Sequence, residues 1–316
     1  MAENKPKVPL LVILGPTASG KTHLSVKVAS LLNGEIISAD SRQVYRDMDI
    51  GTGKDLAEYE LDGRQIPYHL IDIREAGEQY NVNEFQHDFE TAYETISSRG
   101  NVPILCGGTG FYILSLLKGH AYAAIPVNEK LRAELEELPK DLLLARFASY
   151  QTTYQPIADT STRKRLIRAI EISDFLTHNP AEEAFTEKPA YDYIVFGLNP
   201  RVEVRRDRIS ARLRTRLEHG LIEEVKALLE RGLTAEQLIY YGLEYKWITL
   251  YLTGALHYEE MVSRLETEIH RFAKRQMTFF RKMEKDGIEI QWLDNEYNTD
   301  EQAQRIFRQY QQYSTN

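Results

Sequence analysis

The sequence is poor in cysteine and has no long apolar run. Cys106 is the one cysteine among 316 residues, which excludes a disulfide framework and a zinc site built on cysteines. No apolar run approaches the ~18 residues that a membrane-spanning helix needs. No signal peptide precedes the first predicted strand, and we see no repeat or low-complexity linker. We therefore expect a protein of a reducing, cytoplasmic compartment that does not act at a membrane.

Basic residues are outnumbered overall but concentrated in three segments. The chain has 39 basic and 47 acidic residues and a net charge of −8. Segments 163–168, 201–216 and 271–282 together hold 16 basic and 2 acidic residues in 34 positions. A basic patch on an acidic body is compatible with a polyanionic partner such as nucleic acid. The alternative for any single segment is a solvated helix face.

The most informative motif is the stretch 15–22, which reads Gly-x-x-x-x-Gly-Lys-Thr. It lies between the apolar run 10–14, which predicts a buried strand, and a helical pattern. In such a P-loop, the glycines let backbone N–H groups turn toward a phosphate, Lys21 adds positive charge and the Thr22 hydroxyl is suited to Mg²⁺. We therefore predict a di- or triphosphate ligand, the alternative being a plain glycine-rich turn. The predicted phosphate-binding residues are Gly15, Pro16, Thr17, Ala18, Ser19, Gly20, Lys21 and Thr22.

Polar residues follow the next predicted strands. Asp40 comes after the strand 35–38, and ligands of open parallel sheets bind beyond the carboxyl ends of the strands. If this strand neighbours the first one, Asp40 faces the P-loop as a Mg²⁺ ligand or general base; the alternative is a turn or helix cap. The strand 102–106 ends in Gly-Gly-Thr, where a nucleotide hydrolase would have an aspartate for Mg²⁺. Asp72, in a predicted strand 68–73, is a possible substitute.

The region 120–190 has helical patterns and no convincing strand. Strands return at 193–198 and 288–292, and most of the sequence between them is helical. We therefore predict an α/β fold in which a P-loop parallel sheet flanked by helices comes from 1–119 and 191–316. An all-helical insertion, 120–190, interrupts it.

One predicted helix carries a stripe of arginines. They are spaced 4, 3, 4 and 4 residues apart, which at ~100° per residue places them on one side of a helix. Arginine is suited to bidentate phosphate contact, so we favour phosphate binding over a solvated face. The stripe consists of Arg201, Arg205, Arg208, Arg212 and Arg216. The residues expected to pack beside it are Val202, Ile209, Leu213 and Leu217, with Gly220 capping the helix.

Phenylalanines alternate with cations in the third basic segment, 271–282. This pattern suits RNA, whose exposed bases stack on rings and on arginine planes. The alternative, which we favour for the phenylalanines, is an amphipathic helix that buries them.

Seven stretches together resemble the tRNA dimethylallyltransferases, also called tRNA isopentenyltransferases, and occur in that family's order. They are 15–22, 37–45, 48–54, 80–85, 107–112, 163–172 and 272–281. The family transfers the dimethylallyl group of dimethylallyl diphosphate to N6 of the adenosine 3′-adjacent to the anticodon of tRNA. The resemblance implies that the P-loop, with Arg208 and Arg212, binds the diphosphate leaving group, with Mg²⁺ at Thr22.

The same resemblance assigns the remaining roles. Asp40 is the implied base, Thr109 the polar group beside it and Lys21 a catalytic cation. The anticodon stem-loop is the implied partner, the insertion is part of its binding surface, and we expect a monomer of bacterial type. The residues implied to contact tRNA are Asp40, Ser41, Arg42, Gln43, Thr109, Arg132, Lys164, Arg165, Leu166, Ile167, Arg168, Lys274 and Arg275.

The chain departs from the family pattern at one place. Gly242-Leu243-Glu244 stands where the family has Gly-aromatic-Arg/Lys, which predicts a changed contact on the tRNA side. Three alternatives remain at this stage: a P-loop kinase of a nucleotide or small metabolite, a prenyltransferase of free adenine nucleotides, and a non-enzymatic RNA-binding module gated by a nucleotide.

Overall fold

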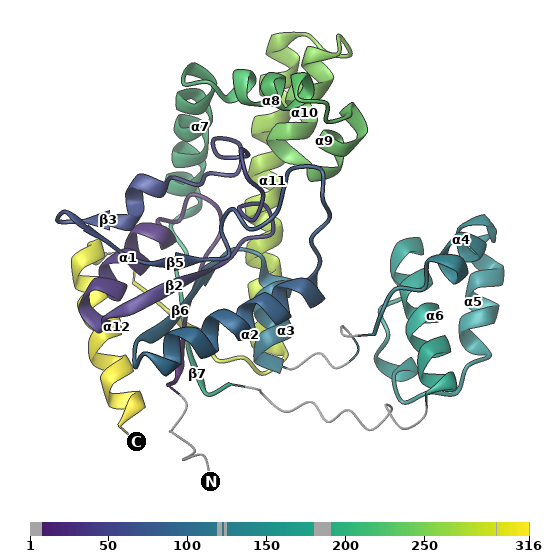
Figure 1. Ribbon diagram of the computed structural model, residues 1–316, viewed down its shortest axis with the longest axis horizontal. Coiled ribbons are helices and arrows are strands. Elements are labelled where there is room, and N and C mark those ends of the chain that lie inside the picture. The colour runs from purple at the N-terminus through teal and green to yellow at the C-terminus, as the bar shows by residue number, and fades with distance from the viewer. Residues whose placement is uncertain (1–7, 119–121, 123–124, 180–190, 295, 316) are drawn as a thin grey trace. The chain divides into compact units, whose positions relative to one another are not determined.

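A computed structural model describes residues 8–118, 122, 125–179, 191–294 and 296–315 (Figure 1). The chain divides into two compact units, residues 1–117 with 191–316 and residues 118–190. The predicted insertion limits, 120 and 190, and the N-terminal residues 1–7 lie outside the described residues. Within the described part of the chain, no helix is both long and apolar enough to cross a membrane.

The larger unit is built on a six-stranded sheet, in which every pair of neighbouring strands is parallel. The order is β5-β2-β6-β1-β7-β8, which confirms the predicted α/β class with a parallel sheet. The condition that β1 and β2 are neighbours is not met, because β6 lies between them and pairs with both. The strands are β1 Leu10–Leu14, β2 Gly34–Ala39, β5 Tyr68–His69, β6 Val102–Gly107, β7 Tyr193–Gly197 and β8 Gln291–Trp292.

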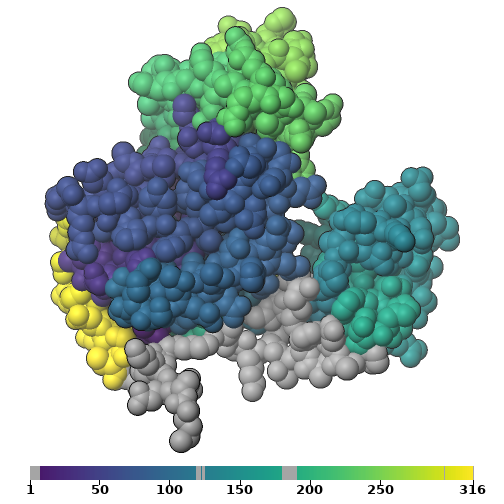
Figure 2. All heavy atoms as spheres, in the orientation of Figure 1, coloured from purple at the N-terminus to yellow at the C-terminus, as the bar shows by residue number. Residues whose placement is uncertain are grey.

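Helices cover both faces of this sheet, so its strands are apolar on both sides. Leu11 and Ile13 of β1 face the helices α1 (Lys21–Leu32) and α12 (Thr299–Ser314). Leu10, Val12 and Leu14 face the other side. Three helices cover that side: α2 (Val82–Ser98), α3 (Gly110–Lys118) and α11 (Tyr258–Lys285). In Figure 2, α12, in yellow, lies along the edge of this unit beside the purple N-terminal part.

Two predicted strands are shorter than the sequence indicated. The expected strand 68–73 ends at His69 because Leu70 and Asp72 have left-handed backbone, with φ of 61° and 56°. The expected strand 288–292 shrinks to β8. Between β2 and β5 the structure adds a short 3₁₀ helix, Leu56–Tyr59, and an antiparallel hairpin of β3 (Glu60–Leu61) and β4 (Arg64–Gln65).

Four helices follow β7: α7 Val202–Glu218, α8 Leu221–Glu230, α9 Ala235–Tyr241 and α10 Leu243–Leu252. They gather at one end of the larger unit, and the long α11 runs from this cluster along the sheet (Figure 1). The expectation that Gly220 caps α7 is corrected: His219 is the cap residue. Gly220, at φ 99°, starts α8.

The smaller unit is helical within its described residues and has a hydrophobic core of its own. Its helices are α4 Glu129–Glu137, α5 Lys140–Ala148, the 3₁₀ helix Gln155–Ile157 and α6 Arg163–His178. Leu131 and Leu135 of α4 pack with Leu143 of α5 and with Leu166 and Ile170 of α6. Side chains from three helices therefore close this core, as expected for a separately packed domain.

Candidate active site

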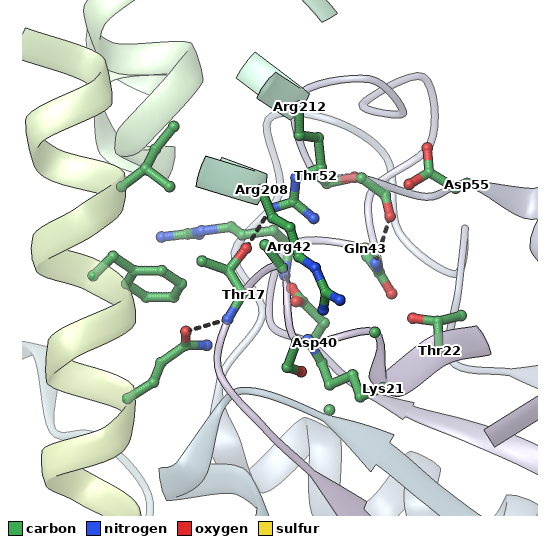
Figure 3. Close-up of a pocket in the computed structure, with 18 of the residues that line it drawn as sticks. Thr17, Lys21, Thr22, Asp40, Arg42, Gln43, Thr52, Asp55, Arg208 and Arg212 are labelled. Atoms are coloured by element: carbon green, nitrogen blue, oxygen red, sulfur yellow. Dashed lines mark hydrogen bonds between the residues drawn. The ribbon is translucent and has the colours of Figure 1, made fainter. Parts of the chain in front are cut away.

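A cavity of about 1360 Å³ opens beyond the carboxyl ends of the central strands, entirely within the larger unit. Figure 3 shows Thr17, Lys21 and Thr22 of the P-loop beside Asp40, Arg42 and the arginines of α7. The predicted residues that line it are Thr17, Ala18, Ser19, Gly20, Lys21, Thr22, Asp40, Ser41, Arg42, Gln43, Thr109, Arg208, Arg212 and Arg275. The cavity thus joins the predicted phosphate grip to the predicted base.

The P-loop has the strained geometry that its motif requires. Ala18 and Gly20 both have left-handed backbone, with φ of 59° and 85°. A Cβ atom at Gly15 would stand 2.6 Å from Ser19 Oγ and 3.1 Å from the Leu198 carbonyl oxygen, so a larger residue would displace the loop. Lys21 then begins α1, whose N-terminus adds positive potential.

Lys21 and Arg212 are half-buried cations of the cavity wall. Desolvation lowers the pKa of Lys21, although the nearby Cys106 and Asp40 favour its charged form. Burial, together with the positive charge of Arg216, lowers the pKa of Arg212 to about 10. The Arg212 guanidinium donates a hydrogen bond to Thr17 Oγ1 of the P-loop (Figure 3). An anionic ligand here would stabilise both cations.

Asp40 lies beside Lys21 in Figure 3, and a hydrogen bond orients its carboxylate. Its Oδ1 accepts the Arg42 N–H at 2.9 Å, so the predicted capping role is present. Thr109 Oγ1 accepts the neighbouring Ser41 N–H at 3.2 Å, and the Thr109 N–H donates to the Ala39 carbonyl at 3.2 Å. Thr109 therefore fixes the turn that presents Asp40.

The residues after Asp40 are also held in place. Gln43 donates to the Gly53 carbonyl at 3.1 Å and accepts the Ser38 hydroxyl at 3.0 Å. Arg42 lies 5.5 Å from the ring centre of Tyr241, within the range of a cation–π contact.

The loop around Gly53 is anchored from α8. Glu224, which sequence reasoning missed, accepts the N–H groups of Asp49, Ile50 and Gly51 at 2.7–3.0 Å and the Tyr245 hydroxyl at 2.7 Å. A carboxylate that accepts several hydrogen bonds from one loop fixes that loop strongly. The wall of the cavity formed by residues 51–53 is therefore rigidly attached to α8.

The arginine stripe divides between two environments. Arg201, Arg208, Arg212 and Arg216 line the cavity. Arg205 does not line the cavity and is buried. Desolvation, and to a smaller extent the positive charge of Arg281, lowers the pKa of Arg205. Of the residues expected to pack, Ile209 and Leu213 are buried and Leu217 is half-buried, but Val202 is 51% exposed because it lies in the first turn of α7.

Asp72 does not substitute for a Mg²⁺-binding aspartate. Its carboxylate accepts a hydrogen bond from the buried Lys54, which also pairs with Asp49 at 2.8 Å. Asp72 is not among the residues that line the cavity. That interpretation is therefore wrong.

The predicted tRNA-binding residues of the insertion have different surroundings. Lys164 and Arg165 are exposed at the start of α6, where Arg165 pairs with Asp159 at 3.0 Å. Arg132 and Arg168 instead lie at 2.7 and 3.6 Å from the buried Glu171, an internal charge cluster. Desolvation lowers the pKa of Arg168, which Glu171 partly offsets.

Leu166 and Ile167 belong to the core of the insertion, with exposures of 0% and 5%. Their side chains cannot reach a bound RNA. The predicted RNA contact therefore does not hold for these two side chains, and their exposed neighbours Lys164 and Arg165 remain available for it. In the larger unit, Lys274 and Arg275 are exposed on α11, whereas Phe280 is fully buried. Phe279 is half-buried and packs against the core, and Phe272 is half-buried and lines the cavity. The packing that we favoured thus holds for Phe280 and in part for Phe279, and not for Phe272.

Glu244, the departure noted in the sequence, lies in the first turn of α10 and lines the cavity. Glu244 is buried, with 8% of its surface exposed. Burial raises the pKa of Glu244, although the positive charges of Arg216 and Arg212 favour its ionised form. The chain therefore places a carboxylate among the arginines where the family pattern predicts a cation.

Glu244→Gln should raise the melting temperature at pH 8. Because the pKa of Glu244 is higher in the folded protein than in the unfolded chain, the carboxyl stabilises the fold fully only below its unfolded pKa of about 4.3. That stability is lost as the pH rises through the folded pKa. Melting curves from pH 4 to 8 should show the gain of the variant shrinking toward acid pH. Glu289→Gln, at an exposed position, is the matched control, and an equal gain at all pH values would contradict the argument.

Comparison with known proteins places these residues in context. The IPP transferase family matches residues 43–283, and the isopentenyl transferase family matches residues 8–76. The chain is 52% identical over 289 residues to tRNA dimethylallyltransferase 2 of Bacteroides fragilis, covering 92% of this chain and 94% of that protein. It is also 52% identical over 301 residues to tRNA dimethylallyltransferase 1 of Porphyromonas gingivalis, covering 95% and 99%.

Solved structures agree with these matches. The full-length tRNA isopentenylpyrophosphate transferase of Bacillus halodurans superimposes with a TM-score of 0.71 at 34% identity, covering 98% of this chain and 97% of that one. A eukaryotic dimethylallyltransferase acting on tRNA superimposes with a TM-score of 0.75 at 25% identity, covering 94% of this chain and 76% of that one. The similarity therefore extends over nearly the whole chain, including the helical insertion.

Proposed function

Because the chain belongs to the IPP transferase family, we propose that it transfers the dimethylallyl group of dimethylallyl diphosphate to N6 of the adenosine 3′-adjacent to the anticodon in tRNA. The observation that carries the proposal is the single cavity that holds both Lys21 with the α7 arginines and Asp40. The P-loop and α7 provide cations for a leaving diphosphate, and Asp40 provides a carboxylate for an attacking amine.

On the donor side, the bond between the allylic carbon and the diphosphate oxygen breaks as positive charge develops on carbon. Negative charge grows on the leaving oxygens, so preformed cations stabilise the transition state more than the ground state. Lys21, Arg208 and Arg212 are placed for this role, and the hydrogen bond from Arg212 to Thr17 fixes the guanidinium against the P-loop.

On the acceptor side, N6 of adenine forms the new bond to the allylic carbon and must lose one proton. Its lone pair is delocalised into the ring, so a nearby base makes the attack easier. Asp40 takes that proton, with its Oδ1 already held by the Arg42 N–H. The reaction leaves prenylated adenosine, diphosphate and one proton on the carboxyl.

The donor set of the cavity suits Mg²⁺. The metal takes one or two protein oxygens and completes its shell with phosphate oxygens and water. Thr22 lines the cavity next to Lys21 and would hold the ion through its hydroxyl. A bound Mg²⁺ would add positive charge at the leaving diphosphate. Among the described residues no cluster of three or more acidic, histidine or cysteine side chains offers a competing metal site.

The acceptor is too large to enter the cavity whole, so the target base must leave its stack and enter alone. We assign the tRNA surface to Ser41, Arg42 and Gln43 at the cavity, Lys274 and Arg275 on α11, and the exposed cations of the insertion. A tRNA substrate places the enzyme in the cytoplasm. We propose that the enzyme acts as a monomer.

The test is an incubation with dimethylallyl diphosphate, Mg²⁺ and unmodified tRNA, followed by nucleoside analysis. Formation of N6-prenylated adenosine and inorganic diphosphate is expected. A kinase would instead convert ATP to ADP and a phosphorylated acceptor, and a prenyltransferase of free nucleotides would modify AMP or ADP in preference to tRNA. A non-enzymatic RNA-binding module would bind tRNA and form no product.

The two groups of cations should separate in a salt titration. Each phosphate contact releases counterions, so losing one flattens the dependence of log K on log salt by about one unit or less. Neutralising Lys164 and Lys274, both exposed, should weaken tRNA binding and flatten this slope. Neutralising Arg208 or Arg212 should mainly impair use of dimethylallyl diphosphate. Equal flattening in both sets would show that the α7 arginines belong to the tRNA surface.

A further inference from the structure

One buried amide connects the P-loop to the turn after β6. Gln276 of α11 is 8% exposed and lines the cavity. Its Oε1 accepts the Thr17 N–H at 2.8 Å, and its Nε2 donates to the Gly108 carbonyl at 3.0 Å. The residues joined in this way are 259 and 168 positions away in the sequence. A single side chain thus fixes the P-loop relative to the turn after β6.

Each arm of the amide leads to a proposed catalytic group. Thr17 also accepts the hydrogen bond from Arg212, and the dashed lines at Thr17 in Figure 3 mark both contacts. Gly108 precedes Thr109, whose hydroxyl holds the Ser41 N–H next to Asp40. The distance between the diphosphate grip and the base therefore depends on Gln276.

Glutamate and asparagine, the residues most similar to glutamine, fit this position less well. A planar amide both accepts and donates, whereas a carboxylate only accepts and would face the Gly108 carbonyl oxygen without a proton. Asparagine is one methylene shorter. The fit is also tight at the other end, since a Cβ atom at Gly108 would stand 2.4 Å from Gln276 Nε2.

We infer that Gln276 is a positioning residue, which sets the donor and acceptor subsites in the relative geometry that prenyl transfer needs. This inference rests on the proposed function and adds a role that none of the sequence motifs indicated. It predicts that loss of the amide slows the step between bound substrates, because a small misplacement of reacting groups is costly. Saturating substrate cannot restore that rate.

Gln276→Glu separates the two arms. When ionised, the new carboxylate keeps the bond from Thr17 and loses the donor to Gly108; when protonated, it regains a donor. Single-turnover rates with saturating tRNA and dimethylallyl diphosphate should fall about tenfold or more at pH 8, an amount typical of lost positioning. The ratio of variant to native rate should recover as the pH is lowered toward 5.5. Gln276→Met, which lacks both arms, should be slow at every pH.

Controls make the outcome decisive. Gln86→Glu changes an amide that donates to the Ser115 carbonyl at 3.2 Å outside the cavity, and its rate ratio should stay near one. Melting temperatures identify variants that merely lose stability. Rates of both Gln276 variants within twofold of native, or a rate ratio for Gln276→Glu that does not change with pH, would overturn the inference.

A binding measurement distinguishes failure of the proposed function from failure of the inference about Gln276. If the native enzyme forms no prenylated adenosine, the function fails, and Gln276 is then tested by titration with Mg²⁺ and inorganic pyrophosphate. Gln276→Met should weaken that binding about tenfold, because Thr17, to which Arg212 donates, loses its bond to Gln276. Unchanged pyrophosphate affinity would overturn the inference without any assay of turnover.

Discussion

Asp40→Asn should slow the chemical step by about 10²–10⁴-fold, the usual contribution of a positioned general base. The amide oxygen can still accept the Arg42 N–H, so the turn after β2 should survive the change. What is lost is the ability to take the N6 proton. Single-turnover measurements with enzyme in excess over tRNA isolate this step, and tRNA affinity should change little.

The matched control for this substitution is Asp62→Asn. Asp62 is exposed in the β3–β4 turn with φ 52°, a conformation that asparagine also tolerates. That variant should retain the native rate. A near-native single-turnover rate in Asp40→Asn would show that Asp40 only caps the turn, and another group would have to accept the proton.

Lys21→Ala should lower turnover by about 10²–10³-fold, the magnitude seen when one donor to a developing negative charge is removed. Desolvation lowers the pKa of Lys21 although Asp40 favours its charged form, and a bound diphosphate would add a further anionic partner. Binding of inorganic pyrophosphate should weaken together with turnover. Thr22→Ala should in addition raise the Mg²⁺ concentration needed for half-maximal rate.

Lys27→Ala is the control on the same helix. Lys27 pairs with Asp300 of α12 and does not line the cavity, and exposed pairs of this kind contribute little to stability. Its rate should match that of the native enzyme. Variants of Lys21 and Thr22 that no longer consume ATP but still use dimethylallyl diphosphate would contradict this prediction. The P-loop would then serve a kinase reaction.

Local motifs predicted much of this architecture. The P-loop is set by eight consecutive residues, so its strand, turn and helix could be read without knowledge of the rest of the fold. The arginines of α7 follow from helical spacing within one segment, and Arg208 and Arg212 reach the cavity as that spacing indicated. Asp40 reaches the same cavity although β2 is not next to β1, because β6 extends the same sheet edge.

The features that sequence reasoning missed depend on partners far along the chain. Gln276 lies in a basic, aromatic stretch in which no pattern distinguishes a glutamine. Its partners Thr17 and Gly108 are distant in the sequence and meet it only in the folded protein. Glu224 resembles any helix-surface glutamate until the loop 49–51 is seen against it. The family motif groups Leu166 and Ile167 with basic neighbours that are implied to contact tRNA, although helical geometry directs these two side chains into the core of the insertion.

The single cysteine has a practical consequence for spectroscopy. Cys106 lies near the end of β6 in the cavity lining, at 5% exposure, and burial raises the pKa of its thiol. Thiol-reactive dyes attack the thiolate, which is scarce at such a site. A new cysteine placed on the insertion or on the exposed side of α11 can therefore be labelled selectively without removing any native residue. Fluorescence transfer between two such labels would then report whether the distance between the two units changes when tRNA binds.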